Sequence, residues 1–151
     1  MEIRELEWFD PPTPCDDSEI SELESRLGVV FPGDYRAFVL LNGGGSPAET
    51  EFDINEPRGV INGSIGVFLT VTSGEYGIAE TLQIVEDRKI AGLIPVAESG
   101  GGDFVCLDYR NSEVPEIAYW HSGRHGLDDE VVKVCATFGE FLSLLEEPSD
   151  E

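Results

Sequence analysis

Two histidines four residues apart, His121 and His125, are the pair whose spacing could bind a metal ion. Residues at i and i+4 share one face of a helix, so two imidazoles there could ligate one ion. Gly123 and Gly126 disfavour a helix at this point, and the HExxH pattern of zinc proteases is absent. We therefore expect polar groups at the end of a strand, with no metal and no cofactor.

A glycine run, Gly100-Gly101-Gly102-Asp103, is the next feature that could do chemistry, by cradling a phosphate. A phosphate cradle needs backbone N–H groups at the start of a helix. This run lies between two apolar strand-like segments and no Lys follows it. We interpret it as a turn between strands in which Gly101 or Gly102 adopts a positive φ.

The sequence shows no motif that would identify a catalytic nucleophile. Ser64 and Ser99 neighbour glycines, but neither completes the G-x-S-x-G turn of a serine hydrolase. The three cysteines are an odd number at wide spacing, which favours core thiols over a disulfide framework or a CxxC zinc site. Acidic residues are so numerous that no carboxylate pair stands above chance as an acid/base dyad. The sequence therefore predicts a protein that is not an enzyme.

The charge is strongly one-sided: 31 acidic residues against 9 basic ones give a formal net charge of -22. Such a surface repels phosphate backbones and anionic lipid, so we expect binding neither to nucleic acid nor to a membrane. A basic protein is the partner that this charge favours, because attraction speeds encounter in a salt-dependent way. The open alternative is that the charge serves solubility alone.

A chain of 151 residues that is 40% apolar is long enough for one domain with a real core. We divide it into a lead-in (1–15), a folded domain (16–147) and an acidic tail (148–151). No apolar run approaches the length of a membrane span, and charges interrupt residues 1–5, where a signal peptide would begin. We expect a cytoplasmic protein, as a monomer or weak homodimer.

Four helices are predicted to position any site. Asp16 and Glu19 form a capping box for a helix over 17–27, which Gly28 ends. The other three are predicted from Pro32 to about residue 42, from about 78 to 87, and from Thr137 onward.

Strands are predicted at 64–71, 93–97, 104–109, 117–121 and 131–136, with short turns between the last four. The segment 45–62 is predicted to be a long loop with one short strand near 52–54. Short turns favour an antiparallel meander, so the fold class is α+β: one antiparallel sheet packed with N-terminal, middle and C-terminal helices.

Two groups of short segments form a recognisable pattern. The first comprises residues 20–29, 31–38 and 42–44, and the second comprises residues 93–97, 100–103, 106–108 and 119–121. The first group resembles the opening, and the second the later signature, of the SUKH superfamily, the SMI/KNR family of cell-wall synthesis regulators and bacterial immunity proteins. The order and spacing of these segments carry the resemblance over most of the chain from about residue 20 to the closing helix.

The resemblance implies a binding domain without catalytic residues. Bacterial members are typically immunity proteins that bind and block a cognate toxin domain, often a nuclease, whereas fungal members are regulatory interaction proteins. We expect a cognate basic toxin domain as partner and keep a regulatory scaffold as the alternative. The expected partner-binding residues are Glu49, Glu51, Asp53, Glu98, Asp103, Asp108, Tyr109 and Trp120. Trp120 could equally be a core indole.

Overall fold

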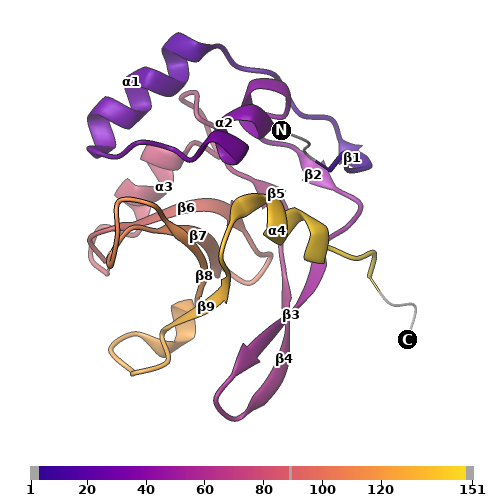
Figure 1. Cartoon of the computed structure of the whole chain (residues 1–151), viewed down its shortest axis with the longest axis vertical. Coiled ribbons are helices and arrows are strands. Elements are labelled where there is room, and N and C mark those ends of the chain that lie inside the picture. Colours follow the sequence, from indigo (N-terminus) through magenta and orange to yellow (C-terminus); the bar gives the residue numbers. More distant parts are fainter. Residues whose placement is uncertain (1–3, 89, 149–151) are drawn as a thin grey trace.

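A computed structural model describes residues 4–88 and 90–148, and it shows a single-domain α+β fold (Figure 1). The helices are α1 (Asp17–Leu27), α2 (Gly33–Leu41), α3 (Ile78–Ile84) and α4 (Phe138–Leu144), with a short 3-10 helix η1 (Ser122–Arg124). The strands are β1 (Trp8–Asp10), β2 (Ser46–Pro47), β3 (Glu51–Glu56), β4 (Gly59–Ser64), β5 (Val67–Phe68), β6 (Leu93–Glu98), β7 (Phe104–Asp108), β8 (Glu116–Trp120) and β9 (Val131–Cys135). No helix in the described ranges is long and apolar enough to span a bilayer.

The main sheet has the order β5-β6-β7-β8-β9, and every neighbouring pair is antiparallel. The predicted meander of the last four strands is therefore confirmed. Pro95 lies in β6, where its missing N–H would break a regular ladder. The pairing of β6 with β7 shifts register between Pro95 and Ala97, so an irregularity accommodates the proline.

Side chains of the sheet are buried on both faces, because successive residues of a strand point in opposite directions. Val105 and Leu107 of β7 belong to the large core cluster beneath α1, α2 and α4. The alternate residues Phe104 and Cys106 belong to a smaller cluster with Trp120 and residues near the end of α3. The sheet is thus a shared layer between two apolar clusters.

The helix ends follow the predicted caps. The Asp16 side chain accepts from the Glu19 N–H at 2.9 Å, and the Glu19 carboxylate accepts from the Asp16 N–H at 3.2 Å. Gly28 adopts φ 72°, the left-handed conformation that ends α1. At α4 the Thr137 hydroxyl accepts from the Glu140 N–H at 3.1 Å, which fixes the predicted start of that helix.

The short strand predicted near 52–54 lies within β3, but the rest of the segment 45–62 departs from the prediction of a long loop. It contains β2 and most of an antiparallel hairpin, β3–β4, in which Phe52 pairs with Gly63 and Ile54 with Ile61. Phe52 and Ile54 are buried and alternate with exposed Asp53 and Asn55, the pattern of a half-buried strand. Acidic residues on the exposed face made this strand pattern look like a loop.

The strand predicted for 64–71 is also wrong over most of its length. Within this range Ser64 ends β4, Val67–Phe68 forms β5, and Thr70 makes an isolated bridge with Gly77. The Leu69 N–H still donates to the Val96 carbonyl at 2.8 Å, but the ladder of paired residues ends at Phe68.

The lead-in and the chain end are held against the body. The Arg4 guanidinium donates to the carbonyls of Leu142 and Leu145 at 2.6 and 2.7 Å. These carbonyls lie at the C-terminal end of α4, where helix carbonyls lack partners within the helix. The backbone of Glu146 pairs with Glu51, so α4 is joined to β3 as well. Of the predicted acidic tail, residues 149–151 lie outside the described residues.

Candidate functional site

The eight expected partner-binding residues do not form one surface. Glu49 is buried, 3.4 Å from Arg4 through its carboxylate, and accepts from the Glu7 N–H at 3.1 Å. Trp120 is 1% exposed and its Nε1 donates to the Glu130 carboxylate at 2.9 Å. The expectation of accessible side chains is wrong for both, because each completes an internal hydrogen bond. For Trp120 the alternative of a core indole is confirmed.

Asp103 and Asp108 also bond within the chain. The Asp103 carboxylate accepts from the Ser122 N–H and hydroxyl at 2.8 and 3.0 Å. The Asp108 carboxylate is buried and accepts two hydrogen bonds of 2.9 Å from the Arg110 guanidinium. Asp103 directly precedes β7 and Asp108 ends it, which places them roughly 17 Å apart at the rise of an extended strand. One partner element cannot use both as a single acidic cluster.

The three remaining carboxylates of the set occupy two other places. Glu51 and Asp53 are on β3, half-buried and exposed respectively, while Glu98 is half-buried at the end of β6. Exposed acids also occur on the lead-in, α1, the segments after α3 and β7, and the chain end. The negative charge of this protein therefore covers its surface broadly.

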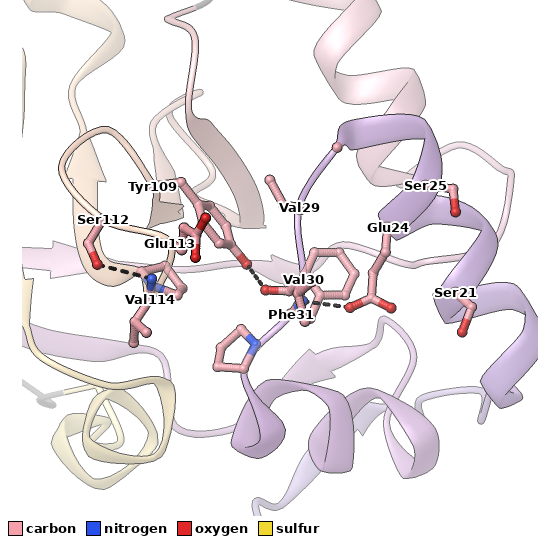
Figure 2. Close-up of a pocket in the computed structure, with 13 residues that line it drawn as sticks. Ser21, Glu24, Ser25, Val29, Val30, Phe31, Tyr109, Ser112, Glu113 and Val114 are labelled. Atoms are coloured by element: carbon pink, nitrogen blue, oxygen red, sulfur yellow. Dashed lines mark hydrogen bonds between the residues drawn. The ribbon is translucent and has the colours of Figure 1, made fainter.

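Tyr109, the eighth residue, lines a groove of about 1020 Å³ (Figure 2). One wall is the face of α1 that carries Ser21, Glu24 and Ser25. The floor is the α1–α2 connection, Val29–Pro32, and the opposite wall is the segment Ser112–Pro115 between β7 and β8. Two parts of the sequence, residues 21–32 and 109–115, thus line this hollow.

Helical periodicity explains how α1 forms its wall. Ser21, Ser25 and Gly28 recur at four and three residues and share one face, whereas Ile20 and Leu23 turn toward the core. The small side chains on the groove face leave room between α1 and the β7–β8 segment. The helix stop at Gly28 then directs the chain across the floor.

Two hydrogen-bonded groups hold the floor in place. The Tyr109 hydroxyl donates to the Val30 carbonyl at 2.8 Å and so joins β7 to the α1–α2 connection. The Glu24 carboxylate accepts from the Phe31 N–H at 2.6 Å and from Arg36 at 2.9 Å. Burial, with the nearby charge of Glu24, raises the pKa of Tyr109, so its phenol stays protonated as a donor at neutral pH.

Among the described residues, no group of three or more His, Cys, Asp or Glu could hold a metal ion. His121 directly follows β8 and its Nε2 lies 2.9 Å from a carboxylate oxygen of Glu56, while exposed His125 lies near Glu130. Burial raises the pKa of Cys135 to about 12, and it raises that of Cys106 further, so both are neutral thiols at pH 7. No His or Cys of residues 4–88 and 90–148 lines the groove, so the features that could bind a partner there are its shape, its apolar side chains and its charge.

Sequence reasoning reached Tyr109 but missed the rest of the groove. Val30 and Val114, from opposite sides of it, are 76% and 73% exposed. The sequence does not show whether a single Val in a connecting segment is exposed, because its burial depends on elements that are distant along the chain. The serines on α1 could have been noticed as a small-residue face beside the apolar stripe.

Comparison with known proteins gives two results. The sequence model of the SMI1 / KNR4 family (SUKH-1) matches residues 14–144 of this chain. The chain is also similar to the "SPbeta prophage-derived uncharacterized protein YokK" of Bacillus subtilis (strain 168), with 25% identity over 146 residues. That alignment covers 86% of this chain and 74% of the relative.

Proposed function

The chain belongs to the SMI1/KNR4 family (SUKH-1), and from this premise we propose that it is a non-enzymatic immunity protein. In this proposal it binds the basic toxic domain of a cognate bacterial toxin, of nuclease type, in the cytoplasm of the producing cell. Binding neutralises the toxin by covering the surface on which its substrate would lie. The similarity to a prophage-derived protein is consistent with a gene carried among elements that encode such toxins.

The observation that carries the proposal is a net charge of -22 spread over a folded domain of this family. A nuclease must attract a phosphate backbone and therefore presents Lys and Arg around its substrate cleft. An acidic protein is attracted to that same surface, and steering of this kind raises association rates toward about 10⁸–10⁹ M⁻¹s⁻¹ at low salt. The charge thus favours encounter at the surface whose occlusion would inhibit the enzyme.

The test uses the toxin domain encoded beside this gene. Cells that express the domain should survive when this protein is co-expressed, and purified protein should abolish its cleavage activity at one equivalent. Polyglutamate added at equal total charge is the matched control and should protect weakly, because it lacks a shaped surface. Failure of the purified protein to bind or inhibit the domain would overturn the proposal.

A regulatory scaffold without a toxin partner is the second candidate, because the resemblance to the SUKH superfamily implies regulatory interaction proteins as well as immunity proteins. Deletion of the gene separates the two. An immunity protein leaves its own cell exposed to the toxin, so deletion should reduce viability only while the toxin gene is intact. A scaffold deletion should have the same effect in both backgrounds.

A further inference from the structure

Two exposed valines flank the groove and make it more than a surface irregularity. Val30 lies on the α1–α2 connection, which forms the floor, and Val114 lies on the segment between β7 and β8, which forms one wall (Figure 2). The rings of Phe31 and Tyr109 also line the groove (Figure 2). Single exposed apolar residues are ordinary on protein surfaces, but apolar surface gathered at one concave place marks a contact site.

We propose that this groove receives a segment of the basic partner in which an apolar side chain is flanked by Lys or Arg. The inference rests on the proposed function and adds to it the place and the chemistry of the contact. The apolar side chain lies between Val30 and Val114, and a flanking cation faces Glu113. In such an arrangement a buried apolar side chain is the anchor of the interface, and charged side chains lie around it at the rim.

Charge complementarity selects the flanking residues. Among the described residues that line the groove, Glu24 and Glu113 are acidic and none is Lys, Arg or His. Glu24 is already occupied by Arg36 and by the Phe31 N–H. Glu113 is exposed and is the rim carboxylate available to an incoming cation. The net charge of -22 strengthens the same preference over the whole surface.

Shape and rigidity favour a chain segment as occupant. The volume of about 1020 Å³ lies just above the usual range for small-molecule sites, about 300–1,000 Å³. Ser25 of α1 is exposed and offers a hydroxyl that can bond to the backbone of an extended segment. The hydrogen bond from Tyr109 to Val30 fixes the floor before binding, which lowers the ordering cost of association.

The first test removes the apolar rim while keeping the fold. The double variant Val30→Ser/Val114→Ser should bind the toxin domain encoded beside this gene at least about tenfold more weakly, through faster dissociation. The matched control is Val60→Ser/Ile84→Ser, which changes two residues of similar exposure, 63% and 73%, away from the groove lining. The control should bind within about twofold of wild type, because exposed substitutions outside an interface are nearly neutral.

The second test separates local contact from overall steering. Glu113→Lys and Glu86→Lys change the net charge equally, and both residues are exposed. Both variants should associate somewhat more slowly, but only Glu113→Lys should also dissociate faster. Equal dissociation rates in the two variants, or unchanged binding by the valine pair, would overturn the groove assignment while leaving the proposed function intact.

Failure of the proposed function is recognised by wild-type protein that does not bind the toxin domain at all. The groove is then judged by NMR titration with short synthetic peptides that carry Leu or Phe between Lys or Arg residues. Amide shifts centred on Val30, Tyr109 and Val114, absent with Glu-flanked counterparts, would support the groove inference independently. Absence of such shifts would overturn the groove inference as well.

Discussion

Replacing Phe38 by alanine tests the packing that holds the helices on the sheet. Phe38 is 1% exposed, and its ring centroid lies 5.0 Å from Phe68, 5.1 Å from Phe138 and 6.4 Å from Trp8. The site thus joins α2 to β5, α4 and β1, four elements from distant parts of the sequence. We expect Phe38→Ala to destabilise all of these contacts together.

The magnitude follows from burial and aromatic contact. Removing a fully buried Phe side chain forfeits about 1.5–3 kcal/mol of transfer free energy, and the cavity left among rigid rings adds a further cost. Three aromatic neighbours are lost as well, each worth about 0.5–1.5 kcal/mol beyond burial and not fully additive. We therefore expect a loss near the upper end of the observed range for Phe→Ala, about 4–5 kcal/mol.

Denaturant melts of wild type and variant measure this loss. Phe9→Ala is the matched control, because Phe9 is 81% exposed and should change the free energy of unfolding by less than about 0.5 kcal/mol. If Phe38→Ala leaves too little stability to measure, Phe38→Leu retains most of the volume and should lose less. A loss below about 1 kcal/mol for Phe38→Ala would refute the packing, because only the replacement of a solvent-exposed ring lowers the free energy of unfolding by so little.

Three further predictions concern a turn, a buried carboxylate and enzymatic activity. Gly102 has φ 90°, so Gly102→Ala should lower the free energy of unfolding by about 1–2 kcal/mol, whereas Gly101→Ala, whose φ is not positive, should be nearly neutral in the same melts. Burial alone raises the pKa of Glu130, but hydrogen bonds from Trp120, Gly126 and His125 outweigh it and lower that pKa. The stabilisation from a depressed carboxyl pKa is present above the unfolded-state pKa and is lost as pH falls through the folded-state value. Melting temperatures should therefore show Glu130→Gln below wild type at pH 7, with the gap closing toward pH 3, and a constant gap would contradict the ionic contribution. The purified protein should cleave no nucleic acid, ester or glycoside; stoichiometric zinc retained after dialysis and lost in His121→Ala would contradict this.

The parts of the fold that the sequence predicted are those with local signals at both ends. Helix α1 has a capping box at Asp16, an apolar stripe and a glycine stop, and the structure begins and ends it at the predicted residues. The last four strands are apolar runs bounded by turns, and their antiparallel order follows from short connections. The glycine turn was also predicted, and Gly102 has the positive φ there.

The hairpin β3–β4 could not be predicted as readily, because its strand pattern depends on contacts across it. A Cβ at Gly63 would lie 2.7 Å from the Ile54 side chain and 2.9 Å from the Phe52 ring, so glycine is required by close packing. In sequence the same glycine, among acidic and polar residues, indicates a loop. In the structure the Phe52 ring packs against Tyr119 and Phe141, which are distant along the chain. These contacts bury one face of the segment and so stabilise it as a strand.

The candidate site was predicted in part for a similar reason. Charge and residue type selected Tyr109 and several carboxylates, but sequence gives no distance between the ends of one strand and another. The structure places Asp103 directly before β7 and Asp108 at the end of that strand, and it uses each in an internal contact. The two exposed valines of the groove, in contrast, come together only because the fold brings the α1–α2 connection close to the segment between β7 and β8. The sequence contains no signal of that proximity.

The association rate between this protein and the proposed basic toxin domain should be measured from low to physiological salt. Screening shortens the reach of the surface charge to about 8 Å at physiological ionic strength. If the charge of -22 recruits a basic toxin, the rate should fall steeply, by tenfold or more, as salt rises, while inhibition persists at one equivalent. A rate that does not depend on salt, together with undiminished toxin activity, would contradict the claim.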